Sequence, residues 1–99
     1  MRLSAEHAHL IRAQALELAG AQARVRLYGS RLHDHLRGGD VDLLLELPSL
    51  PANPALLAAQ LAGRVSRALH GRKVDVLIDA PGLKQLPIHQ IARSQGVLL

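Results

Sequence analysis

Cysteine is absent from the 99 residues of this sequence. Its absence excludes a disulfide framework, a thiolate zinc site and a cysteine nucleophile. Tyr28 is the only aromatic residue, so the chain lacks the rings on which single-stranded bases stack, and we do not expect a nucleic-acid ligand. No apolar run approaches the roughly 20 residues that span a bilayer. Glu6 and His7 interrupt any signal-peptide pattern, so we expect a cytoplasmic protein without a membrane partner.

Positive charge exceeds negative charge in this chain. Twelve Lys and Arg against eight Asp and Glu give a formal net charge of +4. Such an excess favours an anionic partner, such as a nucleotide or an acidic protein, although it also serves solubility. With 48% hydrophobic residues, the sequence predicts a single domain over residues 1–99 with one modest core. A partner or a second copy would have to supply any separate acceptor-binding surface.

The spacing of apolar residues and of helix- and strand-breaking residues predicts alternating helices and strands. Ser4 is the expected N-cap of the first helix, and Asn53 followed by Pro54 predicts the start of a longer one. We expect helices over residues 4–20, 31–36, 54–71 and 87–94, and strands over residues 24–28, 41–47 and 73–78. The order αβαβαβα predicts an α/β domain, with a small mixed three-stranded sheet and the helices packed on one face. The apolar tail at residues 97–99 completes the core or serves a homo-oligomer or partner interface.

The predicted strands carry acidic residues on one face only. Side chains alternate between the faces of a strand. One face is apolar and is expected to form the core: Val25 and Leu27; Val41, Leu43 and Leu45; Val74, Val76 and Ile78. On the other face, Asp40 and Asp42 begin the second strand and Asp75 lies near the start of the third. The helix between these strands predicts a parallel crossover, so the three acids should meet at one end of the sheet.

Three carboxylates on one open face repel one another and need cations to neutralise them. Oxygen ligands select hard cations, chiefly magnesium where phosphate is present. Two such ions can hold the attacking and the leaving oxygen of a displacement at phosphorus. Asp40, Asp42 and Asp75 are therefore candidate catalytic residues and ligands of two Mg²⁺ ions. The alternative is that they belong to a solvated polar face of the sheet.

Gly29 and Ser30 are candidate residues for binding a phosphate group. If the first strand is antiparallel to the second, they arrive at the same end of the sheet as the acids. Glycine permits close approach of the backbone, and the start of a helix after it offers free N–H groups. Ser30 adds a hydroxyl donor, with a plain helix cap as its alternative. Arg31 is a candidate phosphate partner, with simple exposure as its alternative.

These residues together resemble a known family. Gly29-Ser30, nine intervening residues, Asp40-Val41-Asp42-Leu43 and a later Asp75 are similar to the DNA polymerase β nucleotidyltransferase superfamily, and more narrowly to the minimal nucleotidyltransferases. The spacing is one residue shorter than is usual there. Gly38-Gly39 also stands where the family often has a serine or threonine before the first aspartate.

The resemblance implies an enzyme of the polymerase β nucleotidyltransferase fold with ATP as substrate. Asp40 and Asp42 would bind both metal ions, and Asp75 would bind the catalytic one and assist removal of the acceptor proton. Gly29 and Ser30 would hold the triphosphate. Minimal nucleotidyltransferases often accompany a small helical toxin of the HEPN type and act as its antitoxin by adding AMP to a tyrosine. The alternatives are an antitoxin that only binds its partner and an enzyme that modifies a small molecule or an RNA end.

Other polar residues have structural explanations. Arg24 and Arg26 are expected to pair with Glu46 or Asp79 across the sheet rather than to bind phosphate. Tyr28 either packs beside the core, which we favour, or contacts the nucleotide base.

The histidines do not predict a zinc site. His33 and His35, like His7 and His9, are two residues apart, and such pairs do not share a helix face.

A basic group on and after the long helix has two interpretations. Arg64, Arg67, Arg72 and Lys73 form either a solvated helix face or a docking surface for an acidic partner.

Overall fold

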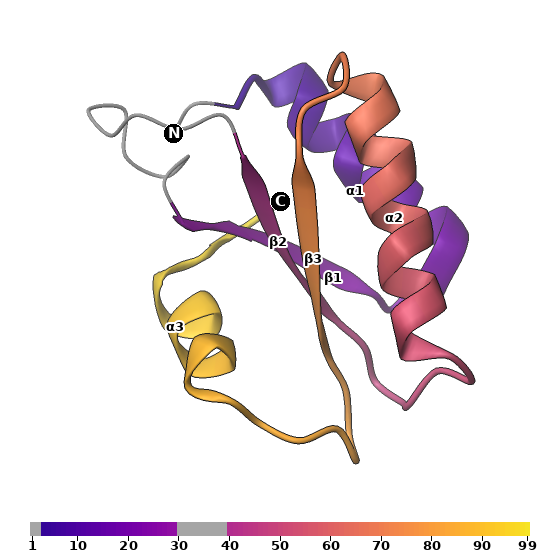
Figure 1. Cartoon of the computed structure of the whole chain (residues 1–99), viewed down its shortest axis with the longest axis vertical. Coiled ribbons are helices and arrows are strands. Elements are labelled where there is room, and N and C mark those ends of the chain that lie inside the picture. The colour runs from indigo at the N-terminus through magenta and orange to yellow at the C-terminus, as the bar shows by residue number, and fades with distance from the viewer. Residues whose placement is uncertain (1–2, 30–39) are drawn as a thin grey trace.

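The computed structural model describes residues 3–29 and 40–99 (Figure 1). The helix expected over residues 31–36 lies outside these ranges. The described elements are α1 (Ala5–Ala19), β1 (Arg24–Tyr28), β2 (Val41–Glu46), α2 (Pro54–Ala68), β3 (Val74–Asp79), α3 (Pro87–Gln95) and β4 (Val97–Leu98). The predicted α/β class is therefore confirmed.

The two long helices begin where their capping residues predict. The Ser4 side chain accepts a hydrogen bond of 3.0 Å from the backbone N–H of His7. Asn53 Oδ1 accepts one of 3.1 Å from the N–H of Leu56, and Pro54 occupies the first turn of α2. Both caps satisfy N–H groups that have no partner within the helix.

The sheet has four described strands, in the order β3-β2-β1-β4. The predicted pairings are confirmed: β1 is antiparallel to β2, and β2 is parallel to β3. The prediction of three strands is wrong because the apolar tail adds β4 beside β1. The Leu99 N–H donates to the Val25 carbonyl at 2.9 Å, and Val97 and Leu98 pair with Leu27 and Arg26. An open strand edge exposes N–H and C=O groups, and the tail provides partners for them.

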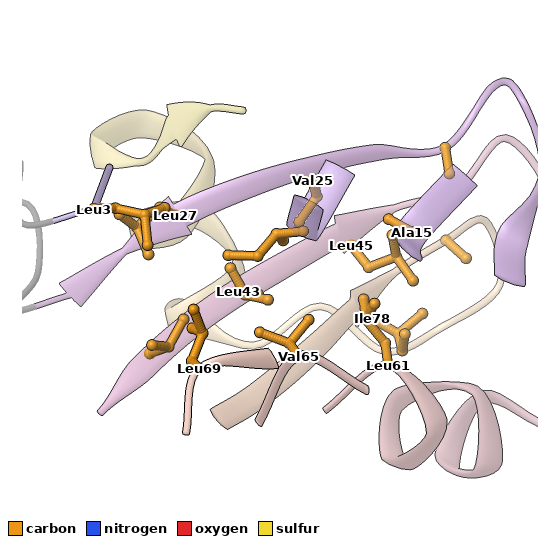
Figure 2. Close-up of a cluster of buried hydrophobic side chains, with 14 residues drawn as sticks. Leu3, Ala15, Val25, Leu27, Leu43, Leu45, Leu61, Val65, Leu69 and Ile78 are labelled. Carbon is orange, nitrogen blue, oxygen red and sulfur yellow. The ribbon is translucent and has the colours of Figure 1, made fainter. Parts of the chain in front are cut away.

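The main core lies between the sheet and the pair of helices α1 and α2 (Figures 1 and 2). The apolar strand rows point into it as the alternation predicts. Ile11 of α1 and Leu61 and Val65 of α2 are fully buried against them. The apolar face is continuous across β1, β2 and β3. Because side chains alternate along each strand, the residues between the apolar ones all point to the opposite face of the sheet.

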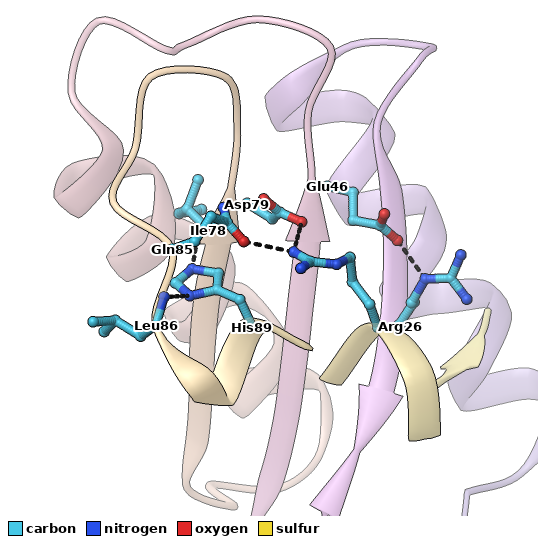
Figure 3. Close-up of polar contacts among 8 residues, drawn as sticks. Arg26, Glu46, Ile78, Asp79, Gln85, Leu86 and His89 are labelled. Carbon is cyan, nitrogen blue, oxygen red and sulfur yellow. Dashed lines mark hydrogen bonds and ion pairs between the residues drawn. The ribbon is translucent and has the colours of Figure 1, made fainter. Parts of the chain in front are cut away.

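The opposite face is partly covered by α3, so the prediction that the helices pack on one face is wrong. Figure 3 shows α3 in front of the sheet, with the other helices behind it. Leu44 explains the arrangement. It is fully buried, although it alternates with the core row and does not belong to the main core cluster. An apolar side chain on this face has to be covered, and α3 lies against β1 and β2 with Ala92 fully buried.

Polar contacts hold α3 to the end of β3 (Figure 3). Arg93 Nη1 and Gln85 Nε2 both donate to the Asp79 carboxylate at 2.8 Å. Burial acts to raise the pKa of Asp79, but these hydrogen bonds and the Arg93 charge outweigh it and lower that pKa. His89, in the first turn of α3, is buried, and its two ring nitrogens contact the Leu86 N–H at the helix start and the Ile78 carbonyl of β3.

Candidate active site

A polar row crosses three strands at the end of the sheet that α3 leaves uncovered. Tyr28 of β1 is the register partner of Asp42 in β2, and Asp42 is the register partner of Asp75 in β3. Directly opposed positions bring Cβ atoms to about 5 Å. Asp40 immediately precedes β2 and therefore lies at the same end of the sheet. We call Asp40, Asp42 and Asp75 together the acidic edge. The parallel crossover therefore brings together acids that are 33 residues apart in the sequence, from Asp42 to Asp75.

The charges in this row perturb one another. Partial burial raises the pKa of Asp42, and the nearby carboxylates of Asp75 and Asp40 raise it further. Burial likewise raises the pKa of the Tyr28 phenol, with added contributions from Asp42 and Asp75. Negative charge at this edge is thus only partly compensated. Such a site attracts cations, because a positive charge relieves the repulsion.

Lys73 supplies a cation that we did not predict at this site. Its Nζ lies 4.0 Å from Asp40 Oδ2 and 3.9 Å from Asp75 Oδ2. The sequence pattern groups Lys73 with the basic residues after the long helix. The signal that places it here is its position two residues before Asp75, since residues i and i+2 of a strand project from the same face.

Gly29 lies against the carboxylate of Asp42. Its φ is +81°, a conformation that side chains disfavour. A Cβ at this position would be 2.5 Å from Asp42 Oδ2, which is well inside van der Waals contact. The glycine therefore permits the end of β1 to approach the acidic edge. This requirement is independent of the phosphate-binding role predicted for Gly29.

Of the other predicted residues, some lie outside the described ranges, Arg26 lies away from the acids, and Tyr28 lies among them. Ser30 and Arg31 lie outside the described residues, as do His33 and His35. Arg26 pairs with Glu46 at the far end of the strands, so its predicted structural role is confirmed. Tyr28 is half-buried on the acidic face and is absent from the core cluster.

A second surface feature lies away from the acids. A groove of about 970 Å³ is lined in part by Arg12, Arg24 and Glu46. Glu46 ends β2 whereas Asp40 precedes it, so this groove is at the opposite end of the sheet from the carboxylates. The candidate catalytic carboxylates therefore lie at the acidic edge and not in this groove.

The donor set of the acidic edge suits magnesium. Asp40, Asp42 and Asp75 offer only carboxylate oxygens, which are the ligands of hard divalent ions. Within residues 3–29 and 40–99, no group of three or more His, Asp or Glu side chains is already arranged as a metal site. Lys73 lies where it neutralises two of the three acids. The residue types and their shared edge fit the metal, and their side chains would have to turn toward it.

Comparison with known proteins assigns no family. No protein-family model matches the sequence, and no curated protein matches it. No helix in the described ranges combines the length and apolar character that crossing a membrane requires.

Proposed function

We propose that this chain is a metal-dependent nucleotidyltransferase that moves a nucleotide, AMP from ATP, onto a protein acceptor. One observation carries the proposal. Asp42 and Asp75 are paired positions of two parallel strands, with Asp40 on the same edge. Carboxylates that converge from two strands can hold a pair of magnesium ions at a phosphoryl group. The motif resemblance described above supports the same assignment.

The chain's own residues would bind and orient the reactants. Magnesium held by the three aspartates would supply charge neutralisation at the phosphate and the acceptor oxygen. In the transfer, the acceptor hydroxyl oxygen bonds to the α-phosphorus, and the bond from that phosphorus to the bridging oxygen breaks. Pyrophosphate leaves with the bonding electrons, and the hydroxyl proton passes to a carboxylate or to water. The Asp75 side chain is 56% exposed, so an approaching acceptor can reach it.

The proposed acceptor is a small helical toxin of the HEPN type, which the chain would silence as its antitoxin. The motif resemblance supports this partner. A protein acceptor that docks on the open acidic edge would complete the site.

A second candidate is an antitoxin that neutralises its partner by binding alone. The placement of Lys73 between Asp40 and Asp75 favours it, because two of the three acids then have a partner without any metal ion.

Intact-mass analysis separates the two candidates. The chain and the protein encoded by its neighbouring gene would be expressed and purified separately, then incubated together with ATP and either Mg²⁺ or EDTA. We expect the acceptor to gain about 329 Da per AMP only with Mg²⁺. A stable complex without any added mass in either condition would reject the transfer reaction and support the binding antitoxin.

Gly29→Ala is expected to slow transfer by about 100-fold. The added Cβ meets the Asp42 carboxylate, and misplacing a catalytic group by about 1 Å costs roughly that factor. The positive φ also costs stability, about 1–2 kcal/mol. Transfer rates and urea unfolding would measure the two effects.

Gly71→Ala is the matched control for this change. Gly71 has a φ of +82°, and a Cβ added there would meet no other atom within 4 Å, so this variant carries the backbone strain without the contact. It should lose similar stability and keep its transfer rate. Equal rates for both variants would contradict a role for the Gly29–Asp42 approach.

A further inference from the structure

A backbone hydrogen bond fixes the position of Lys73, which immediately precedes β3, beside the acidic edge. Its carbonyl accepts a hydrogen bond of 2.9 Å from the Val41 N–H, just before the first register pair of β2 and β3. Its side chain therefore leaves the sheet on the same face as Asp75. The ammonium lies within 4.0 Å of carboxylates from two different strands, Asp40 and Asp75.

Structural stabilisation does not account for this placement. The Lys73 side chain is 68% exposed, and those of Asp40 and Asp75 are 54% and 56% exposed. Ion pairs with such exposure add little to folding stability. The contact matters instead because it involves two of the three acids that the proposed function assigns to magnesium.

We propose that Lys73 couples metal binding to triphosphate binding at this site. Its ammonium competes with a free divalent cation for Asp40 and Asp75, and it attracts the negatively charged complex of the metal with a triphosphate. The inference rests on the proposed function and assigns Lys73 as a positioning residue. The site then fills when metal and nucleotide arrive together rather than with metal alone.

Electrostatics sets the size of the effect. A unit charge and a divalent ion about 6 Å apart in water repel enough to change a binding constant roughly tenfold. Screening at about 0.1 M salt reduces this to roughly threefold. The same magnitude with the opposite sign applies to a metal–triphosphate complex, whose net charge is negative. Removing the ammonium should thus shift the two affinities in opposite directions.

Lys73→Met tests the coupling. Binding of the metal alone is measured with Mn²⁺. The paramagnetic resonance signal of the free ion gives the fraction that is not bound. Calorimetry measures binding of Mn²⁺ with α,β-methylene-ATP, which cannot undergo the transfer. We expect Lys73→Met to bind free Mn²⁺ about threefold to tenfold more tightly and the nucleotide complex more weakly by a similar factor.

Two variants control for charge and for folding. Lys84→Met removes the same charge beyond the other end of β3 and should change neither affinity. Lys73→Arg keeps the charge and should restore values close to those of the unaltered protein. Unchanged affinities in Lys73→Met, or two affinities that fall together, would overturn the coupling.

Asp42→Asn separates this inference from the proposed function. Loss of Mn²⁺ binding in Asp42→Asn supports the acidic edge as the metal site, whatever Lys73 does. Mn²⁺ binding by Lys73→Met but not by the unaltered protein supports an especially strong competition. Absence of Mn²⁺ binding by both would overturn the coupling together with the metal-dependent function.

Discussion

Asp42→Asn is expected to abolish nucleotidyl transfer and, at the same time, to raise the thermal stability of the metal-free protein. The loss of activity should be about 1,000-fold or more, because the central carboxylate of the polar row would no longer bind a metal ion or balance its charge. Asp42 is the register partner of both Tyr28 and Asp75 and therefore occupies the middle of the row.

The gain in stability follows from the sign of the pKa shift. Burial and the Asp75 and Asp40 carboxylates raise the pKa of Asp42 in the folded state. The folded protein therefore holds that proton more tightly than the unfolded chain does, and ionisation of Asp42 destabilises the fold. The protonated Asp42 carboxyl therefore stabilises the fold at low pH, and this stabilisation is lost as the pH rises above about 4. The neutral asparagine does not undergo the loss.

Thermal unfolding in EDTA between about pH 4 and pH 7 would measure the difference. The melting temperature of Asp42→Asn should exceed that of the unaltered protein by a margin that grows with pH. Glu46→Gln is the control, because Glu46 lies on the same strand and face but pairs with Arg26 at the far end. It should retain transfer and show no such gain. A less stable Asp42→Asn variant would contradict the charge repulsion inferred for the acidic edge.

His89→Ala should lower the free energy of unfolding by about 2–4 kcal/mol. His89 is 3% exposed. Its Nδ1 accepts from the Leu86 N–H at 3.0 Å, so its Nε2 carries the hydrogen and donates to the Ile78 carbonyl at 3.0 Å. Alanine leaves both backbone groups without these partners and opens a cavity beneath α3. Because α3 covers Leu44, the change also loosens the cover on the second face of the sheet.

Urea unfolding would measure this loss, with His9→Ala as the control. His9 is an exposed residue of α1, and replacing it should change stability by less than about 0.5 kcal/mol. A loss below about 1 kcal/mol for His89→Ala would show that the two hydrogen bonds contribute little to holding α3 in place. Transfer activity measured at a temperature where the variant stays folded should be nearly unaffected, since His89 lies away from the acidic edge.

Much of the fold can be predicted from local patterns. Ser4 and Asn53 act through backbone groups three residues away, so the helix starts depend on neighbours in the chain. The alternation along β1 and β2 likewise depends on backbone geometry alone. A helix between two strands leaves a parallel crossover as the expected connection, and this is why Asp42 and Asp75 were expected side by side.

Contacts between distant segments could not be predicted in the same way. The tail pairs with β1 because that strand has an open edge, which becomes apparent only once the strand order is known. The position of α3 depends on the burial of Leu44. The burial of His89 could not be predicted, because its Nε2 bonds to the Ile78 carbonyl of β3, although its other partner, Leu86, is only three residues away. At the candidate site, the sequence by itself determined which carboxylates share an edge, since strand periodicity and crossover direction are local rules. Only the tertiary structure decided that Lys73 reaches two of them and that Gly29 lies against Asp42, because these depend on distances between side chains from different strands.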